Sequence, residues 1–84
     1  MGTFEQIIKI CKDFKEKKFD LIEFQSRLQT VLIADEIKQY LNSVLHDADN
    51  RLEEIRFCSL EENFYKYGVE VADSLMEKVN SLSV

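Results

Sequence analysis

The chain has no proline and only two glycines among its 84 residues. Tight turns between short strands draw on Gly, Pro, Asn and Asp, because these residues supply the special backbone angles that such turns need. Their scarcity predicts a few long helices with short connections and disfavours a sheet of many strands. A chain of this length supports one hydrophobic core, so we expect a single helical domain over residues 1–84.

Two amphipathic helices are predicted in the first part of the chain. Thr3, with a glutamine three positions later, is typical of a capping box, and apolar residues then recur every three or four positions over residues 4–17. Asp20, with a glutamate three positions later, forms a second box and predicts a helix over residues 21–31.

Two longer helices are predicted in the second part. Asp35 is positioned to cap a helix whose apolar residues repeat at spacings of three and four as far as Phe57. Whether residues 46–51 interrupt this helix stays open. Ser59, with a glutamate three positions later, is the clearest capping box and opens a helix to about Asn80. Four amphipathic helices with short connections predict a small all-α, antiparallel four-helix bundle.

The fourth predicted helix is apolar over an arc of about 200°, against about 100° for a typical surface helix. Its wider arc comes from a second apolar stripe made of Tyr65, Val69, Ala72, Met76 and Val79. One interpretation is that the helix packs against two or three neighbours in the bundle. The other is that the second stripe meets another protein or a second copy, as in a homodimer through this helix. Gly68 costs about 1 kcal/mol relative to Ala in mid-helix, so we expect a neighbouring helix to approach closely there.

The sequence offers no group of residues typical of an enzyme, a cofactor site or a metal site. His46, the only histidine, lies opposite the apolar stripe of its helix and is expected to face solvent. Cys11 shares the apolar side of the first helix, where a buried and unreactive thiol is expected. The segment from Asp47 resembles the start of a calcium loop, but Leu52 and Cys58 replace the required Gly and Glu. Glycine-rich phosphate loops are absent.

Cysteine usage and hydropathy predict a reduced, cytoplasmic protein. The chain has two cysteines and neither an apolar signal segment nor a run long enough to cross a membrane. One disulfide that closes a long loop stays open as an alternative. The lysines of residues 12–18 are interrupted by acids, which favours a solvated helix end over a membrane-surface helix.

Charge is distributed unevenly along the chain. Residues 1–33 hold six Lys or Arg against five Asp or Glu, whereas residues 34–84 hold five against eleven, a balance of −6. This acidic excess disfavours nucleic-acid binding, which requires cations that face the phosphates. The partner that it favours is a basic protein.

The acids of the third helix define a candidate binding face. Three of them fall within about 20° of one another along one flank of the apolar stripe and span about 27 Å. With the two acids that open the fourth helix and the tyrosine one turn later, the predicted partner-binding residues are Glu36, Asp47, Glu54, Glu61, Glu62 and Tyr65. Two interpretations stay open, a solvated face partly neutralised by Arg51 or a docking face for a basic protein anchored by the tyrosine.

Residues 12–28, KDFKEKKFDLIEFQSRL, resemble the helix-turn-helix near the start of the colicin D immunity protein family. The matching positions are Phe14, Lys18, Phe19, Asp20, Ile22, Glu23, Phe24, Arg27 and Leu28. The resemblance implies a small α-helical protein that binds a cognate toxin nuclease domain and blocks its active site. In that family the toxin cleaves tRNA, and acidic groups of the immunity protein take the place of substrate phosphates. The matched residues belong to the scaffold, so no toxin-contacting residue is carried over.

The sequence therefore predicts one of two functions. The first is an immunity protein that inhibits a basic toxin domain, with an affinity that falls as salt rises. The alternative is a helical interaction or regulatory module without a toxin partner, which joins other proteins through the exposed stripe of the fourth helix.

Overall fold

The computed structural model describes residues 2–31 and 35–82, and the side chains of residues 35–38 lie outside the described part. The described residues form four α-helices and one short 3-10 turn, with no strand among them. These elements are α1 (Thr3–Lys15), α2 (Leu21–Gln29), α3 (Asp35–Cys58), η1 (Glu61–Asn63) and α4 (Phe64–Leu82). The predicted all-α class and the number of helices are confirmed.

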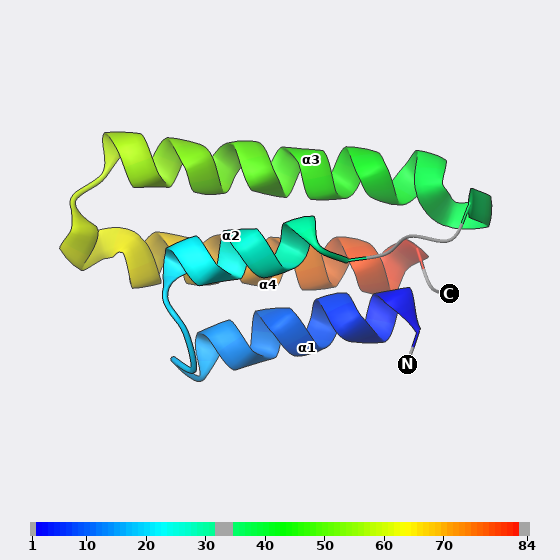
Figure 1. The fold of residues 1–84 in the computed structure, drawn as a ribbon, viewed down its shortest axis with the longest axis horizontal. Coiled ribbons are helices and arrows are strands. Elements are labelled where there is room, and N and C mark those ends of the chain that lie inside the picture. Colours follow the sequence, from blue (N-terminus) through cyan, green and yellow to red (C-terminus); the bar gives the residue numbers. More distant parts are fainter. Residues whose placement is uncertain (1, 32–34, 83–84) are drawn as a thin grey trace.

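The helices form an antiparallel bundle in which α1 and α3 each pack against both α2 and α4 (Figure 1). The bundle measures 38 × 22 × 20 Å. The α1–α2 turn and the α3–α4 connection lie at one end of its long axis, whereas α3 begins at the opposite end. We call the former the turn end, comprising residues 16–20 and 59–63.

Gly68 allows α4 to approach α1 and α2, as the sequence predicts. A Cβ atom at this position would lie 2.5 Å from Cζ of Phe14 and 2.7 Å from Cδ1 of Leu21. Neither neighbour is at the surface, since both side chains are buried. The ring of Phe14 also stacks on that of Phe24, with centroids 4.4 Å apart. The backbone of α4 thus closes the core at a point where only glycine fits without displacement.

The wide apolar arc of α4 packs inside the bundle. Ala72 and Val79 are fully buried, while Val69 and Met76 are partly buried against the core. Tyr65 alone among this stripe retains substantial exposure, at 38%. These positions favour the interpretation in which α4 contacts several neighbours.

One predicted cap is confirmed. Oδ1 of Asp20 accepts a hydrogen bond from the backbone N–H of Glu23 at 2.8 Å, so Asp20 caps α2. The reach-back half of the box does not form, because the Glu23 carboxylate accepts a hydrogen bond from Nε of Arg27 instead.

The capping box predicted at Ser59 is wrong, and α1 begins one residue before its predicted start. Thr3 is already the first helical residue of α1, and Gly2 takes the cap position. Ser59 directly follows the last residue of α3, Cys58, and its N–H still donates to the carbonyl of Ile55. Leu60, in extended conformation, separates it from η1 and makes no side-chain cap bond. Residues 32–34 and the side chain of Asp35 lie outside the described part, and so does the cap predicted at Asp35.

Helix α3 continues without a break through residues 46–51. Within this stretch, Oδ1 of Asp49 accepts hydrogen bonds from the amides of Gln25 and Gln29, each at 2.9 Å. Nη1 of Arg56 donates to Oε1 of the buried Gln25 at 2.7 Å. This network satisfies a polar group inside the α2–α3 interface and fixes how the two helices align.

Candidate functional site

The acidic flank of α3 lies along its seam with α4. Asp47 is exposed and borders a small recess that includes Arg51 and Lys78. Glu54 is exposed too and lines a groove of about 230 Å³ with Arg51, Tyr67 and other residues. Cations therefore alternate with these carboxylates along the seam. Glu36 falls in the first turn of α3, with its side chain outside the described residues.

Tyr65 and Glu61 line a different groove, which lies at the turn end and has a volume of about 350 Å³. At about 100° per residue, Tyr65 and Tyr67 point roughly 200° apart around α4. The groove of Tyr65 is thus on the other side of α4 from the seam that holds Glu54. Glu62 is exposed beside Glu61 in η1. Among the predicted partner-binding residues, Glu54 and Tyr65 thus line separate grooves.

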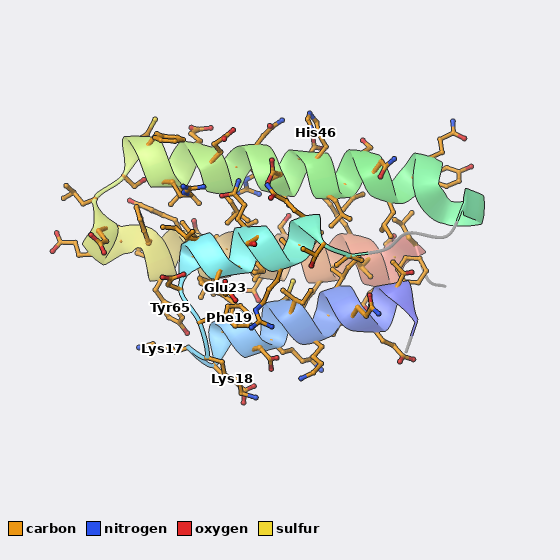
Figure 2. The ribbon with its side chains drawn as sticks, in the orientation of Figure 1. Lys17, Lys18, Phe19, Glu23, His46 and Tyr65 are labelled. Carbon is orange, nitrogen blue, oxygen red and sulfur yellow. The ribbon has the colours of Figure 1, made fainter. Side chains whose placement is uncertain are left out.

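Contacts with α1 hold the Tyr65 side chain in place. Its hydroxyl donates to the carbonyl oxygen of Lys15, and its ring centroid lies 5.6 Å from that of Phe14. Nζ of Lys17 lies 4.7 Å from the centre of the ring. Figure 2 shows Lys17, Phe19 and Tyr65 close together at the turn end. The tyrosine has a structural role as well as an exposed edge.

The end of α1 has an unusual backbone conformation. Lys17 has a φ of 64°, in the left-handed region that favours glycine. Its N–H donates to the carbonyl of Phe14 at 2.9 Å, and that of Lys18 donates to the carbonyl of Asp13 at 3.0 Å. This pair of bonds is a Schellman motif, which satisfies carbonyls that the helix end would leave free. A lysine in place of glycine explains why the sequence gives no signal of this cap.

Ion pairs also stabilise the second half of α1 and its end. Nζ of Lys15 lies 2.6 Å from the carboxylate of Asp73, so α1 is tied to α4, and the hydrogen bond raises the pKa of Lys15. Loss of solvent contact raises the pKa of Asp13, but hydrogen bonds from Lys9 and Lys18 outweigh it and hold this pKa below its usual value. Much of the basic charge in this half of the chain is thus engaged within the bundle.

Two large apolar side chains, one in the last turn of α3 and one just before η1, are exposed and were not among the predicted binding residues. Phe57 is 75% exposed and Leu60 is 65% exposed, the highest fractions among the large apolar residues of the described part. A signal for Phe57 was present, because it lies about 200° from Ile55 around the helix and hence off the apolar stripe. Leu60 precedes η1 and projects into solvent.

The side chains that could act in catalysis or bind a metal are dispersed. His46 is exposed on the outer side of α3, as predicted (Figure 2). Both cysteines are free. Cys11 is buried, which raises the pKa of its thiol to about 12, and Cys58 is exposed. Over residues 2–31 and 39–82, no three His, Cys, Asp or Glu side chains are placed to hold a metal ion. None of the described helices has the length and apolar character that a bilayer span requires.

The residues of the colicin D-like stretch build the α1–α2 hairpin. Phe14, Phe24 and Leu28 are core residues, and Asp20 supplies the cap of α2. The guanidinium of Arg27 lies 4.6 Å from the ring centre of the half-buried Phe19. No protein-family model, curated protein or solved structure gave a significant match to the chain.

Proposed function

We propose that this chain is a cytoplasmic immunity protein that binds a basic bacterial toxin domain, a nuclease, and inhibits it by covering the active site with carboxylates. The observation that supports this most is the exposed acidic surface of the second half of the chain, presented on a packed bundle. The colicin D-like hairpin supports the same class of protein.

The physical basis is charge complementarity. A toxin that cleaves RNA or DNA needs a cationic cleft to bind phosphates, and an array of carboxylates can occupy that cleft. Asp47 and Glu54 stand on one regular helix, so little conformational freedom is lost on binding. Opposite charges on the two proteins also raise the association rate, and added salt lowers it.

Co-expression provides the direct test. Cells that express the C-terminal domain encoded by the adjacent upstream gene should survive when this chain is expressed with it. The purified pair should form a complex whose affinity falls as salt concentration rises. A domain that stays toxic and unbound would refute the proposal.

Charge reversal tests the flank of α3. Glu36→Lys, Asp47→Lys and Glu54→Lys together should slow association at least 10-fold while circular dichroism shows the same helix content. A matched control reverses three exposed acids elsewhere, namely Glu5, Glu16 and Glu77, and changes the net charge equally. Equal rates for the two triple variants would show that overall charge, and not this flank, steers the partner.

The alternative is a helical interaction or regulatory module without a toxin partner. The exposed edge of Tyr65 on α4 favours this second candidate. It predicts an assembly that Tyr65→Ala disrupts and whose affinity barely depends on salt. A homodimer through α4 would need an apolar stripe that is mostly buried within the bundle, and sedimentation at two concentrations tests for it.

A further inference from the structure

We infer that the toxin domain docks end-on, at the junction between α3 and α4, with Phe57 and Leu60 as apolar anchors. We call this surface the α3–α4 corner, and its residues are Glu53, Glu54, Phe57, Leu60, Glu61 and Glu62. The inference rests on the proposed function and names the part of the surface that meets the partner.

Exposure of the two anchors is the first observation. Phe57 and Leu60 stand outside the core cluster, to which other apolar residues of the neighbouring turns belong. They are three positions apart, and Leu60 is held in extended backbone between the end of α3 and η1. Large apolar side chains exposed next to each other mark interaction sites more often than chance exposure does. Aromatic anchors surrounded by polar groups are also where binding energy concentrates.

Charge at the corner is the second observation. Glu53, Glu54, Glu61 and Glu62 are all exposed, and none of them forms an ion pair within the described residues. Arg56 lies on the same part of α3, where it donates to Gln25 and its guanidinium lies 5.6 Å from the ring centre of Phe57. The apolar anchors thus share their segments of the chain with four carboxylates that make no ion pair among the described residues.

These charges favour a basic protein over a second copy of the chain as the partner bound at the corner. A second copy bound through a two-fold axis would bring the same carboxylates against each other, which is unfavourable. A basic protein brings cations to those positions instead. The groove beside the corner is lined by Glu54, Glu70 and Tyr67 together with Arg51. Its two carboxylates outnumber the one cation, and its aromatic ring can also contact a cationic side chain of that partner.

End-on docking also predicts how strongly each acid of α3 contributes to binding. Glu54 belongs to the corner, whereas Asp47 lies about 10 Å and Glu36 about 27 Å further along the helix axis. The bundle is 38 Å long, so Glu36 is near its opposite end. The effect of charge reversal should therefore fall in the order Glu54, Asp47, Glu36.

A pair of matched variants tests the corner. Phe57→Ser with Leu60→Ser removes both anchors, and Tyr40→Ser removes the exposed aromatic ring (64% exposed) near the other end of α3. Each variant is titrated against the C-terminal domain encoded by the adjacent upstream gene. We expect the corner variant to bind at least 30-fold more weakly through faster dissociation, and Tyr40→Ser to bind within 2-fold of the unmodified chain. Circular dichroism should be unchanged in both, since all three side chains are exposed.

The outcomes separate the two proposals. Tight binding by the unmodified chain and by the corner variant would overturn end-on docking and leave the immunity function standing. No binding and no protection by the unmodified chain would overturn the immunity function, and the corner as a toxin site with it. A concentration-dependent dimer that the corner variant loses would assign the corner to a second copy, against our inference. Glu61→Gln with Glu62→Gln should reduce the salt dependence of binding, and an unchanged dependence would count against the corner.

Discussion

Gly68→Ala is the most direct test of how the bundle closes. The added methyl group would lie 2.5 Å from Cζ of Phe14 and 2.7 Å from Cδ1 of Leu21. These distances are far inside ordinary van der Waals contact, about 3.5–4.0 Å between carbon atoms. Phe14 is not free to rotate away, because its ring stacks on Phe24 and contacts Tyr65. The helices must therefore separate slightly.

Two opposing effects set the magnitude. Alanine is favoured over glycine in mid-helix by about 1 kcal/mol. Overpacking of a filled core costs about 1–3 kcal/mol. The difference predicts that Gly68→Ala lowers the free energy of unfolding by about 0–2 kcal/mol. For a domain of this size, each kcal/mol lowers Tm by about 4–8 °C.

Urea denaturation followed by circular dichroism measures the effect, and a double-mutant cycle assigns its cause. In a Phe14→Leu background the ring atom nearest the new methyl group is gone, so Gly68→Ala should cost less or become stabilising. A gain of the full helix-propensity term, about 1 kcal/mol, in the otherwise unmodified chain would refute the close approach. Equal costs in both backgrounds would show that Phe14 is not the obstacle.

Three further perturbations test the core, the caps and the acid response. Phe24→Ala should cost about 3–5 kcal/mol in chemical denaturation, because Phe24 is fully buried, and a change within about 0.5 kcal/mol would mean that α2 is misplaced. Asp20→Ala should cost about 0.5–2 kcal/mol through its cap bond, whereas Ser59→Ala should stay within about 0.5 kcal/mol; equal costs would contradict the two cap geometries. Asp13 has a lowered pKa, so its contribution to stability is present above the ordinary value of 3.8 and is lost as pH falls through the lowered pKa. Denaturation between pH 7 and pH 2.5 should show a smaller loss in Asp13→Asn than in the unmodified chain.

The fold was predictable because its determinants are local. Apolar residues such as Phe14 and Phe24 recur at helical spacing, and this spacing states which side of each helix is buried. Gly68 was informative too. Glycine is unfavourable in mid-helix, so its presence there indicates that a neighbouring helix approaches closely. Helix starts were less predictable. Ser59 has the residue type of a cap, but α3 runs on to Cys58 and leaves the serine at a helix end.

The candidate site was predictable only within single helices. Helical periodicity placed Asp47 and Glu54 on an exposed flank of α3, and both are exposed. It could not relate them to Tyr65, because the rotation of α4 against α3 depends on packing across the whole bundle. Phe57 was missed because a single apolar residue off the stripe is common at protein surfaces. Its importance comes from the exposed Leu60 three positions later and from the exposed carboxylates around both, which make no ion pair among the described residues.

The residues proposed to bind the partner are separate from those that form the core, so stability and binding can be tested independently. The core of the bundle uses Phe14, Phe24 and Gly68, whereas the α3–α4 corner is exposed and makes little contribution to packing. Effects of substitutions more than about 7–10 Å apart usually add. A core variant should thus lower stability with unchanged affinity while the chain remains folded, and Phe57→Ser with Leu60→Ser should do the reverse. Apolar surface held in solvent beside unpaired carboxylates gives the folded chain no advantage that the bundle itself explains. Binding a basic partner accounts for both features with one contact.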